Sequence, residues 1–245
     1  MARYKVILAY DGSDFKGYQR QRNARTVQGV FEAALRSLGW QGVTVLSSGR
    51  TDTGVHATGQ VVAFDIEWEH TSTELLNALN ANLPKDMAVR RLEGAPVDFH
   101  PRYAAKARRY RYRLFCDEIR DPLRERYTWR VWPPVYLLNL QEVADLLVGT
   151  HDFGAFGKPP KPGGKTVRTI VCATWREESG DLIFEITGNS FLYHMVRRLV
   201  AFQVSAAQNG TILDEAVRYL SEGERLPYVG LAPAQGLTLV EVHYS

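Results

Sequence analysis

The residues best suited to chemistry lie in one stretch, 47–57, where glycines, hydroxyl groups, an arginine, an aspartate and a histidine separate two apolar runs. A simple turn between strands is shorter and does not need such side chains. An aspartate in a glycine-rich turn is usually structural, but an ionised carboxylate can also attack C1′ of a sugar. Arg50, two residues before Asp52, can hold a phosphate or fill the space of a displaced base. We therefore predict that Asp52 is a catalytic nucleophile.

A nucleophilic carboxylate benefits from a fixed cation that keeps it ionised. Arg197 follows the apolar and aromatic run 191–195, in a predicted helix whose other positions are apolar. An arginine in such a helix requires a carboxylate partner, and Asp52 is the partner we predict. A surface position beside Arg198 is the alternative, and the sequence alone does not decide between them.

The familiar metal and cofactor motifs are missing from the sequence. We find no phosphate-binding GxxxxGK[ST] loop, no GxGxxG that opens a helix, no HExxH and no serine–histidine–aspartate elbow. His56 and His194 lack metal-ligand spacing, and we expect them to form hydrogen bonds or to lie in the core. Cys116 and Cys172 stand alone in strand-like runs, which favours free thiols over a zinc site. We therefore expect chemistry without metal or cofactor.

The composition is that of a globular protein, with 245 residues, 45% of them hydrophobic and 23% charged. The net charge of +3 says little by itself, but the mildly basic sequence pI of about 8.8 leaves room for a polyanionic partner. No apolar run reaches the ~20 residues of a membrane span, and the first residues lead into a strand and not into a signal peptide. We expect a cytoplasmic protein that does not enter a membrane.

A basic strand, 108–113, offers a surface for nucleic acid. Its period of two places Arg109, Arg111 and Arg113 on one face, and Tyr110 and Tyr112 on the other. An arginine row matches a phosphate backbone, and tyrosine rings suit unstacked bases. A solvated edge strand protected by charge is the alternative. We favour nucleic acid, because two more basic clusters occur in the sequence, one at 197–198 and one formed by Lys16, Arg20, Arg22 and Arg25.

The order of predicted elements gives the fold class. The first half reads as a strand at 3–10, a helix at 27–38 capped by Thr26 and ended by Gly39, strands at 43–46 and 59–66, a helix from 71 or 72 to 80, and a strand at 87–92. This is the order of the split βαβ, ferredoxin-like unit.

The second half repeats the plan more loosely. We expect a strand at 108–115, a helix at 140–147 capped by Asn139, strands at 167–177 and 182–188, a helix from Ser190 to about 208, a short helix at 213–221 and a strand at 236–244. The prediction is an α+β protein with two ferredoxin-like halves, 1–105 and 106–245, whose mainly antiparallel sheets flank a central basic cleft. The run 158–165, with three lysines and no acid, reads equally as a solvated loop or as a phosphate contact.

Several motifs in order along the chain resemble those of the tRNA pseudouridine synthase A family. They are residues 10–13 (YDGS) with Phe15, Gly17 and Gln19, and then 48–57 (SGRTDTGVHA), 80–84 (NANLP), 99–102 (FHPR), 107–112 (ARRYRY), 189–197 (NSFLYHMVR) and 236–239 (GLTL). The resemblance covers nearly the whole chain, and the motif around Asp52 is highly specific. Tyr18 departs from the tryptophan expected there but keeps an aromatic ring.

This resemblance implies conversion of uridine to pseudouridine at positions 38, 39 and 40 of the tRNA anticodon stem-loop. It implies that Asp52 is the nucleophile, that Tyr110 packs on the flipped base, and that Arg197 pairs with Asp52. It also implies that Leu237 shapes the base pocket and that Arg50 takes the place of the flipped base. The family is homodimeric and needs no cofactor or metal.

Two other functions compete with this interpretation. An RNA-binding module without activity can use ferredoxin-like sheets, but the sequence lacks the usual glycine and aromatic pattern, and Asp52 would be unexplained. A carboxylate glycosidase normally needs two acids at the scissile bond, and the stretch 50–57 offers one.

Overall fold

The structure, a computed structural model, describes residues 1–209 and 230–244. The chain forms two compact units: unit 1 comprises Met1–Lys106 and Thr238–Ser245, and unit 2 comprises Ala107–Leu237. The last strand therefore groups with the first hundred residues, whereas the predicted division at 105/106 leaves it with the second half.

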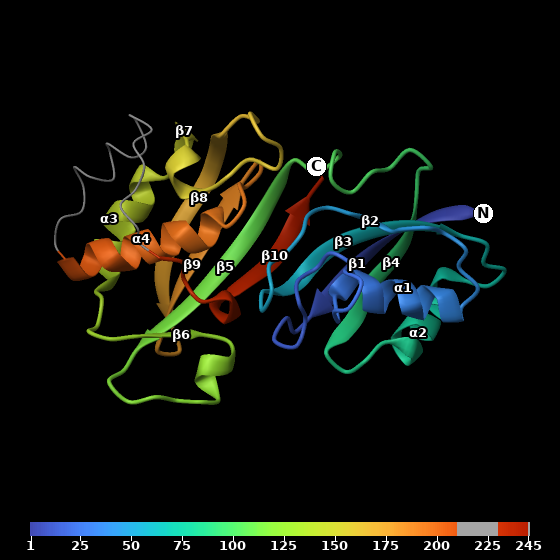
Figure 1. Cartoon of the computed structure of the whole chain (residues 1–245), viewed down its shortest axis with the longest axis horizontal. Helices are drawn as coiled ribbons and strands as arrows, with labels where there is room; N and C mark the ends of the chain where they lie inside the picture. Colours follow the sequence, from blue (N-terminus) through green and yellow to red (C-terminus); the bar gives the residue numbers. More distant parts are fainter. Residues whose placement is uncertain (210–229, 245) are drawn as a thin grey trace. The chain divides into compact units, whose positions relative to one another are not determined.

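Unit 1 contains an antiparallel sheet in the order β4-β1-β3, with two further strands on β3 (Figure 1). The short β2 pairs antiparallel with β3, whereas β10 pairs parallel with the start of β3. The order β4-β1-β3-β2 is that of a split βαβ unit. The elements of unit 1 are β1 (Ala2–Tyr10), α1 (Val27–Ser37), β2 (Leu46–Ser47), β3 (His56–Ile66), α2 (Ser72–Asn82), β4 (Met87–Ala95) and β10 (Leu237–His243).

The local signals for both helices of unit 1 are confirmed. The side chain of Thr26 accepts the Gly29 N–H and begins α1, and Gly39 follows its end with a φ of +88°, where glycine is favoured. Thr71 and Glu74 form a capping box at α2. The buried apolar stripe of α1 packs on the sheet, and the ring of Phe31 in α1 meets that of Phe64 in β3 edge-on.

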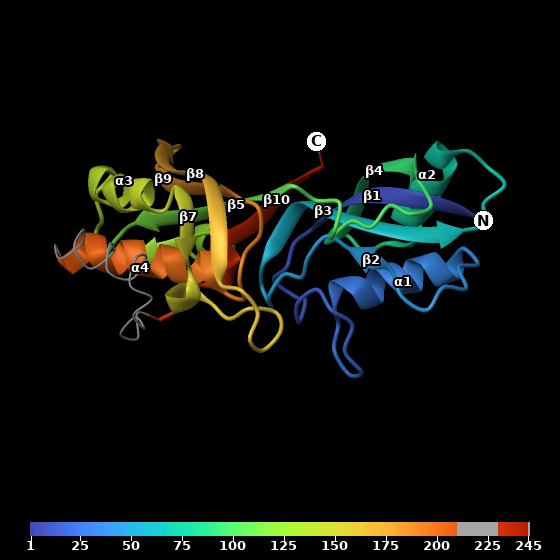
Figure 2. The ribbon, with the colours of Figure 1, turned by 90° about the horizontal axis from the view of Figure 1, so that it is seen from above.

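Unit 2 contains an antiparallel sheet in the order β5-β9-β8-β7, with β6 parallel to β5. Helices α3 and α4 lie beside it (Figure 2), and α4 is fixed to β8 by a buried hydrogen bond from Trp175 Nε1 to Gln203 Oε1 (2.8 Å). The elements of unit 2 are β5 (Ala107–Cys116), β6 (Trp129–Val131), α3 (Leu137–Leu146), β7 (Gly149–Asp152), β8 (Val167–Glu178), β9 (Asp181–Gly188), α4 (Met195–Asn209) and the 3-10 helices η1 (Arg124–Arg126), η2 (Gly154–Phe156) and η3 (Ala234–Gly236).

The α+β class with mainly antiparallel strands is confirmed, but two predicted helix starts are wrong. Asn139 does not cap a helix, because α3 begins at Leu137 without a side-chain cap. Ser190 does not cap α4, which begins at Met195, since His194 has a φ of +64° that no α-helix accommodates. Strands β6 and β7 were not predicted. The predicted helix 213–221 lies outside the described residues.

Candidate active site

The predicted catalytic stretch is the loop 48–55, which joins β2 to β3 in unit 1. Its start is held to β3, because the Ser48 N–H donates to the Val61 carbonyl (2.9 Å) and Ser48 Oγ donates to Gln60 Oε1 (2.7 Å). Gln60 Nε2 then donates to the carbonyl of Gly49 (3.1 Å). Because Gln60 is fully buried, these bonds fix the entry of the loop firmly.

Asp52 begins a tight turn within this loop. The Val55 N–H donates to the Asp52 carbonyl (3.2 Å), and Gly54 has a φ of +80°, which glycine adopts without strain. Thr51 and Val55 are buried, while Asp52 between them is half-buried. The turn therefore holds a half-buried aspartate on a backbone whose neighbouring residues are buried.

The N-terminal loop clamps the residue before Asp52. The hydroxyl groups of Tyr10 and Thr51 share a buried hydrogen bond of 2.8 Å, and the Tyr18 N–H donates to the Thr51 carbonyl (3.0 Å). Gly17, with a φ of +84°, lies so close that an added Cβ would be 3.1 Å from the same carbonyl oxygen. Thr51 is thus held through both its side chain and its backbone.

A second clamp holds the end of the turn. The Gly12 N–H donates to His56 Nδ1 (2.9 Å), and a Cβ at Gly12 would lie 2.0 Å from the Val55 carbonyl oxygen. The Asp11 carboxylate lies 3.2 Å from His56 Nδ1. His56 is therefore a buried hydrogen-bonding residue of the loop support, as the sequence predicts.

The sequence does not predict these supporting contacts. Tyr10 and Gly12 stand out in it only as members of a motif. The only signal for them was the position of that motif beside the end of the first strand. Long-range pairing of β1 with β3 then brings the two loops together.

Tyr18 and Arg50 differ sharply in environment. The Tyr18 ring is buried, and this burial raises the pKa of its phenol well above the usual range, so the group stays neutral. Arg50 is exposed and makes no ion pair among the residues that the structure describes. Its guanidinium is therefore available to an anion or to a base.

The predicted basic cluster in the N-terminal loop is partly neutralised. Arg20 Nη1 lies 2.5 Å from Glu32, whose carboxylate is fully buried, and Arg25 forms a two-bond ion pair with Asp86 (2.7 and 2.9 Å). These two arginines tie the loop to α1 and to the start of β4. Only Lys16 and Arg22 of this cluster are left without a carboxylate partner in the described part of the chain.

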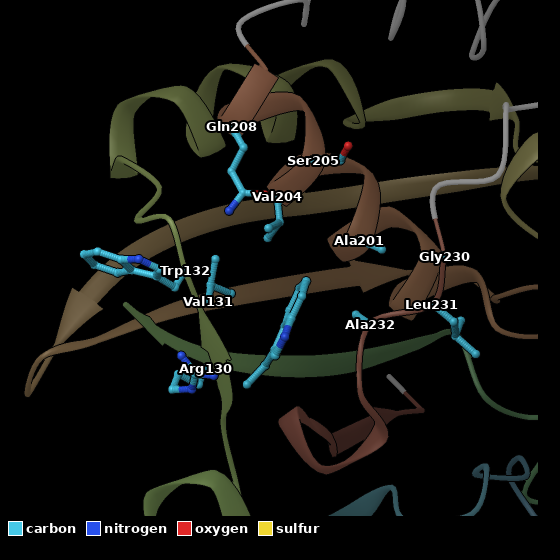
Figure 3. A pocket seen from close by; sticks show the side chains of 11 residues that line it. Arg130, Val131, Trp132, Ala201, Val204, Ser205, Gln208, Gly230, Leu231 and Ala232 are labelled. Carbon is cyan, nitrogen blue, oxygen red and sulfur yellow. The ribbon is translucent and has the colours of Figure 1, made fainter. Parts of the chain in front are cut away.

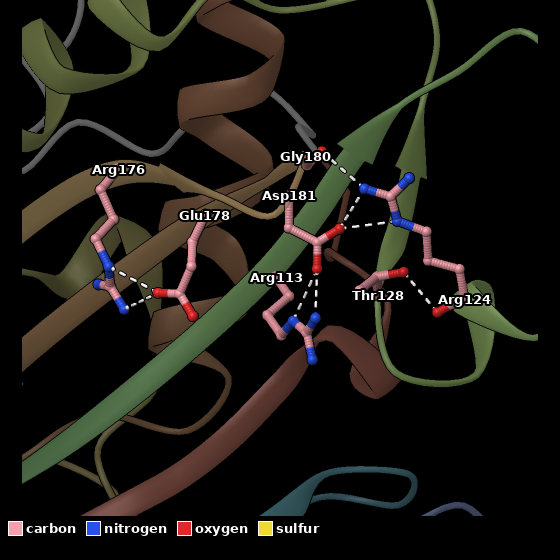
Figure 4. A network of polar contacts seen from close by, with 7 residues as sticks. All are labelled: Arg113, Arg124, Thr128, Arg176, Glu178, Gly180 and Asp181. Atoms are coloured by element: carbon pink, nitrogen blue, oxygen red, sulfur yellow. Dashed lines mark hydrogen bonds and ion pairs between the residues drawn. The ribbon is translucent and has the colours of Figure 1, made fainter.

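Two of the three arginines in the predicted row on β5, Arg111 and Arg113, bind carboxylates on β9. Arg111 binds Glu185 through Nε (2.9 Å) and Nη2 (2.7 Å). Burial raises the pKa of Glu185, but the hydrogen bond and charge of Arg111 outweigh it, so the pKa lies below its usual range. Arg113 binds the buried Asp181, which Arg124 also contacts (Figure 4). The row is thus partly compensated within unit 2.

The two tyrosines of β5 have different environments. Tyr110 is half-buried, and its ring meets Phe191 edge-on at 5.1 Å. Tyr112 is fully buried, and its hydroxyl donates to the Pro233 carbonyl (2.8 Å). The interpretation of Tyr112 as a surface for bases is therefore wrong, because its ring packs against Gly236, where an added Cβ would lie 2.5 Å away.

Arg197 of α4 is half-buried, and Leu237 is buried; both belong to unit 2. Arg197 Nε donates to the carbonyl of Ala232 (2.7 Å), and the Ala232 N–H donates back to the Arg197 carbonyl (3.3 Å). Leu237 is buried at the start of β10. Among the predicted site residues, Asp52 and Arg50 belong to unit 1, whereas Tyr110, Arg197 and Leu237 belong to unit 2. The pairing of Asp52 with Arg197 stays a prediction.

A cavity of about 420 Å³ lies in unit 2 between β6, α4 and residues 230–232 (Figure 3). Trp129, Trp132 and Gln208 contribute to its walls, but none of the predicted site residues does. Residues 1–209 and 230–244 contain no group of three or more metal-binding side chains. Within the same residues, no helix is long and apolar enough to cross a membrane.

Comparison with known proteins identifies the class. A sequence model described as tRNA pseudouridine synthase matches residues 6–104 and 143–245, which places the chain among RNA-modifying isomerases. Proteins named tRNA pseudouridine synthase A are similar over full length. The one from Lacticaseibacillus casei (strain BL23) is 42% identical over all of both chains, and that from Limosilactobacillus reuteri (strain DSM 20016) is 39% identical over 100% of this chain and 98% of its own. The chain belongs to the tRNA pseudouridine synthase A family, whose members are isomerases that act on tRNA.

A third relative of the same name agrees with this assignment. The tRNA pseudouridine synthase A of Halalkalibacterium halodurans is 41% identical over 97% of this chain and 90% of its own. Among solved structures, a chain of "Crystal Structure of a Cbf5-Nop10-Gar1 Complex" has a TM-score of 0.42 and 10% identity, and the match covers 96% of this chain and 60% of that chain.

Proposed function

We propose that this enzyme converts uridine to pseudouridine at positions 38, 39 and 40 of the tRNA anticodon stem-loop, without a cofactor. The reaction breaks the bond between N1 of uracil and C1′ of the ribose. The uracil turns while held in the site, and its C5 then bonds to C1′. The C5 proton is lost and N1 gains a proton, so that substrate and product are isomers.

The observation that carries this proposal is the clamped turn around Asp52. Asp52 is half-buried, while Thr51 and Val55 on either side of it are buried and held by the N-terminal loop. Preorganisation of this kind suits a nucleophile that must meet one carbon atom. Asp52 acts at the sugar, either by adding to C1′ or by a route through a glycal-type intermediate.

The remaining site residues have separate roles in this proposal. Arg50, exposed two residues from Asp52, occupies the space that the flipped base leaves. Tyr110, supported edge-on by Phe191, packs on the flipped base and assists removal of the C5 proton. Arg197 pairs with Asp52 and keeps it ionised, and Leu237 shapes the base pocket. The proposal thus requires side chains of both units to meet in the enzyme–tRNA complex.

Phosphate contacts supply the energy for flipping a base out of a stem, which costs a few kcal/mol. Arg109 and Arg111 of β5 are our candidates for such contacts. Since Arg111 already binds Glu185, a phosphate would share it with that carboxylate. We expect Arg111→Ala to weaken tRNA binding and to reduce its salt dependence; an unchanged salt slope would remove Arg111 from the RNA surface.

The proposal includes the setting in which the enzyme works. We propose a cytoplasmic homodimer that binds one tRNA across both subunits and that needs no metal. Light scattering of the purified protein at micromolar concentration measures the dimer directly, and a monomer mass would contradict this part of the proposal.

The decisive experiment maps pseudouridine by mass spectrometry in a tRNA transcript with uridines at positions 38–40. We expect modification by the wild type and none by Asp52→Ala, with tRNA affinity largely retained. Asp14→Ala is the matched control, because Asp14 is an exposed acid of the neighbouring loop and its loss should leave activity intact. Activity in Asp52→Ala would overturn the nucleophile, and modification only at other uridines would overturn the substrate position.

A further inference from the structure

In unit 2, the connection between η2 and β8 carries positive charges and no negative ones. It contains residues 158–165, which we call the lysine loop, with three lysines, three prolines, two glycines and no acid. Seven of these eight residues are exposed and Pro159 is half-buried. The sequence left this segment open between a solvated loop and a phosphate contact. The structure adds four observations that favour the phosphate contact.

The lysine loop is built to keep one shape. The Gly164 N–H donates to the carbonyl of Lys161 (3.0 Å), and Gly163 has a φ of +72°. This four-residue turn, with Pro162 second and glycine third, uses the residues that a type II turn requires. Because proline also fixes φ at two more positions of the loop, less conformational entropy is lost when a partner binds.

The base of the loop is anchored to the segment that leads into α4. Lys158 pairs with Tyr193 in a β-bridge, and the Tyr193 N–H donates to the Lys158 carbonyl (3.0 Å). Gly157 approaches Leu192 so closely that an added Cβ would lie 2.6 Å from its Cβ. The base of the lysine loop is therefore bonded to the segment 192–193, which lies a few residues before Arg197 in the sequence.

The charges of the lysine loop are uncompensated. Lys158, Lys161 and Lys165 have no carboxylate partner among residues 1–209 and 230–244, in contrast to Arg111 and Arg113 of the same unit, which bind Glu185 and Asp181. Tyr193, at the foot of the loop, is 59% exposed. Free cations beside an exposed ring are the combination that binds a nucleic-acid backbone and stacks on a base or sugar.

Arg168 supports the C-terminal end of the lysine loop through hydrogen bonds to its backbone. Arg168 Nη1 donates to the carbonyls of Lys165 (2.9 Å) and Val167 (2.7 Å). Burial lowers the pKa of Arg168 below its usual range, but an arginine stays charged under all ordinary conditions. Arg168 therefore supports the loop, while the three lysines are left for a partner.

We propose that the lysine loop and Tyr193 form a binding surface for the phosphate backbone of the tRNA substrate. The identity of the RNA rests on the proposed function, whereas the affinity for a polyanion rests on the loop itself. Each lysine neutralises a phosphate and releases a bound counterion, so the contact is strong at low salt and weak at high salt. The Tyr193 ring stacks beside this backbone contact.

The test compares the wild type with the triple variant Lys158→Ala, Lys161→Ala and Lys165→Ala. Equilibrium binding of unmodified tRNA is measured at several salt concentrations, with both proteins in the Asp52→Ala background so that no turnover occurs. We expect roughly tenfold weaker binding at low salt and a salt slope smaller by about 2. The fold should be intact, because all three side chains are exposed; thermal unfolding checks this.

Two matched variants make the result specific. Lys158→Arg, Lys161→Arg and Lys165→Arg together keep the charge, and binding should stay within about twofold of the wild type. The triple Lys85→Ala, Arg90→Ala and Arg91→Ala removes the same net charge from exposed cations of unit 1, and it should change the slope far less. For Tyr193 alone, Phe should preserve binding and Ala should weaken it.

Unchanged affinity and slope in the lysine-to-alanine triple would overturn the proposal. Loss of the dimer without loss of RNA binding would also overturn it, because the loop would then serve a protein interface. The proposed reaction can fail independently: if no pseudouridine forms but the triple variant still loses RNA affinity, the binding surface stands and the assigned chemistry does not.

Discussion

The hydroxyl groups of Tyr10 and Thr51 lie 2.8 Å apart in the core of unit 1, one residue before Asp52. Tyr10 ends the first strand, so this bond connects the first ten residues of the chain to the loop predicted to carry the nucleophile. Both residues are buried, with 4% and 7% of their surfaces exposed. The bond is therefore shielded from water, and removal of the Tyr10 hydroxyl takes a buried hydrogen-bond partner away from Thr51.

Replacement of Tyr10 by phenylalanine tests whether this bond positions the Asp52 turn. We expect the free energy of unfolding to fall by about 1–2 kcal/mol. We also expect the rate of pseudouridine formation at saturating tRNA to fall roughly tenfold, because small displacements of reacting groups slow catalysis. Affinity for tRNA should be unchanged.

The control for this substitution is Tyr4→Phe. Tyr4 lies on the same buried face of β1, and its hydroxyl makes no hydrogen bond within the described residues. Urea unfolding and single-turnover assays should show little change for this variant. Equal effects of the two substitutions would mean that the Tyr10–Thr51 bond has no positioning role.

Replacement by alanine should destabilise the protein at Gly12 but not at Gly49. A Cβ at Gly12 would lie 2.0 Å from the carbonyl oxygen of Val55, a backbone atom that cannot yield alone, whereas a Cβ at Gly49 would meet nothing within 4 Å. We expect Gly12→Ala to lower the free energy of unfolding by about 2 kcal/mol or more and to abolish turnover. Gly49→Ala should unfold like the wild type. Calorimetry compares the two, and a stable, active Gly12→Ala protein would show that the loops do not have to touch.

Local signals in the sequence were sufficient for much of unit 1. The cap at Thr26, the start of α2 at 71 or 72 and the glycine after α1 act over a few residues, so they can be recognised without the fold. The loop around Asp52 was also recognisable, because its residue types are unusual for a turn. The start of β3 at His56 was missed, since strand pairing extends it past the apolar run.

Other features depend on distant parts of the chain and could not be read locally. Helix α4 begins five residues later than predicted, because Tyr193 pairs with Lys158 instead of entering the helix. The face of β5 that carries Arg111 was identified correctly by its period of two. Its compensation by Glu185, 74 residues away, required the register of β5 against β9.

The ion pair between Arg3 and Asp65 should make stability depend on pH. The two residues are opposite each other on β1 and β3 and form two bonds of 2.7 Å. The hydrogen bond from Arg3 lowers the pKa of Asp65 below its usual value, against the opposing effect of burial. The pair therefore stabilises the fold above the unfolded-state pKa of about 3.9, and this contribution is lost as the pH falls through the lower folded-state pKa.

Arg3→Met isolates this contribution. At pH 7 the variant should lose about 1 kcal/mol of unfolding free energy, a value kept small because Asp65 is 34% exposed. The difference from the wild type should shrink as the pH falls below about 4. Arg90→Met, which removes an exposed cation from β4, should show no such trend when urea unfolding is repeated from pH 7 to pH 3. A difference that stays constant with pH would contradict the role of the ion pair.

Asp181 should contribute more to stability than any exposed ion pair of unit 2. Its side chain is 3% exposed and accepts from Nε of Arg113 (2.9 Å) and Nε of Arg124 (2.8 Å), whose guanidinium also lies 4.1 Å from the Phe115 ring centre. This carboxylate joins the start of β9 to β5 and η1 (Figure 4). Its neutralisation would leave two guanidinium groups side by side without a counter-charge.

We expect Asp181→Asn to lower the free energy of unfolding by about 2 kcal/mol, less than for a wholly buried pair because both arginines are partly exposed. Glu178→Gln is the matched control. It removes one carboxylate from an exposed pair with Arg176 (3.0 Å), whose partners are 54% and 39% exposed, and it should cost less than about 1 kcal/mol. Urea unfolding at 0.1 M and 1 M salt distinguishes the two substitutions, since salt screens exposed charges and should reduce the effect of Glu178→Gln more than that of Asp181→Asn. If Asp181→Asn and Glu178→Gln lower the free energy of unfolding by the same amount at each salt concentration, Asp181 stabilises unit 2 no more than a surface charge does.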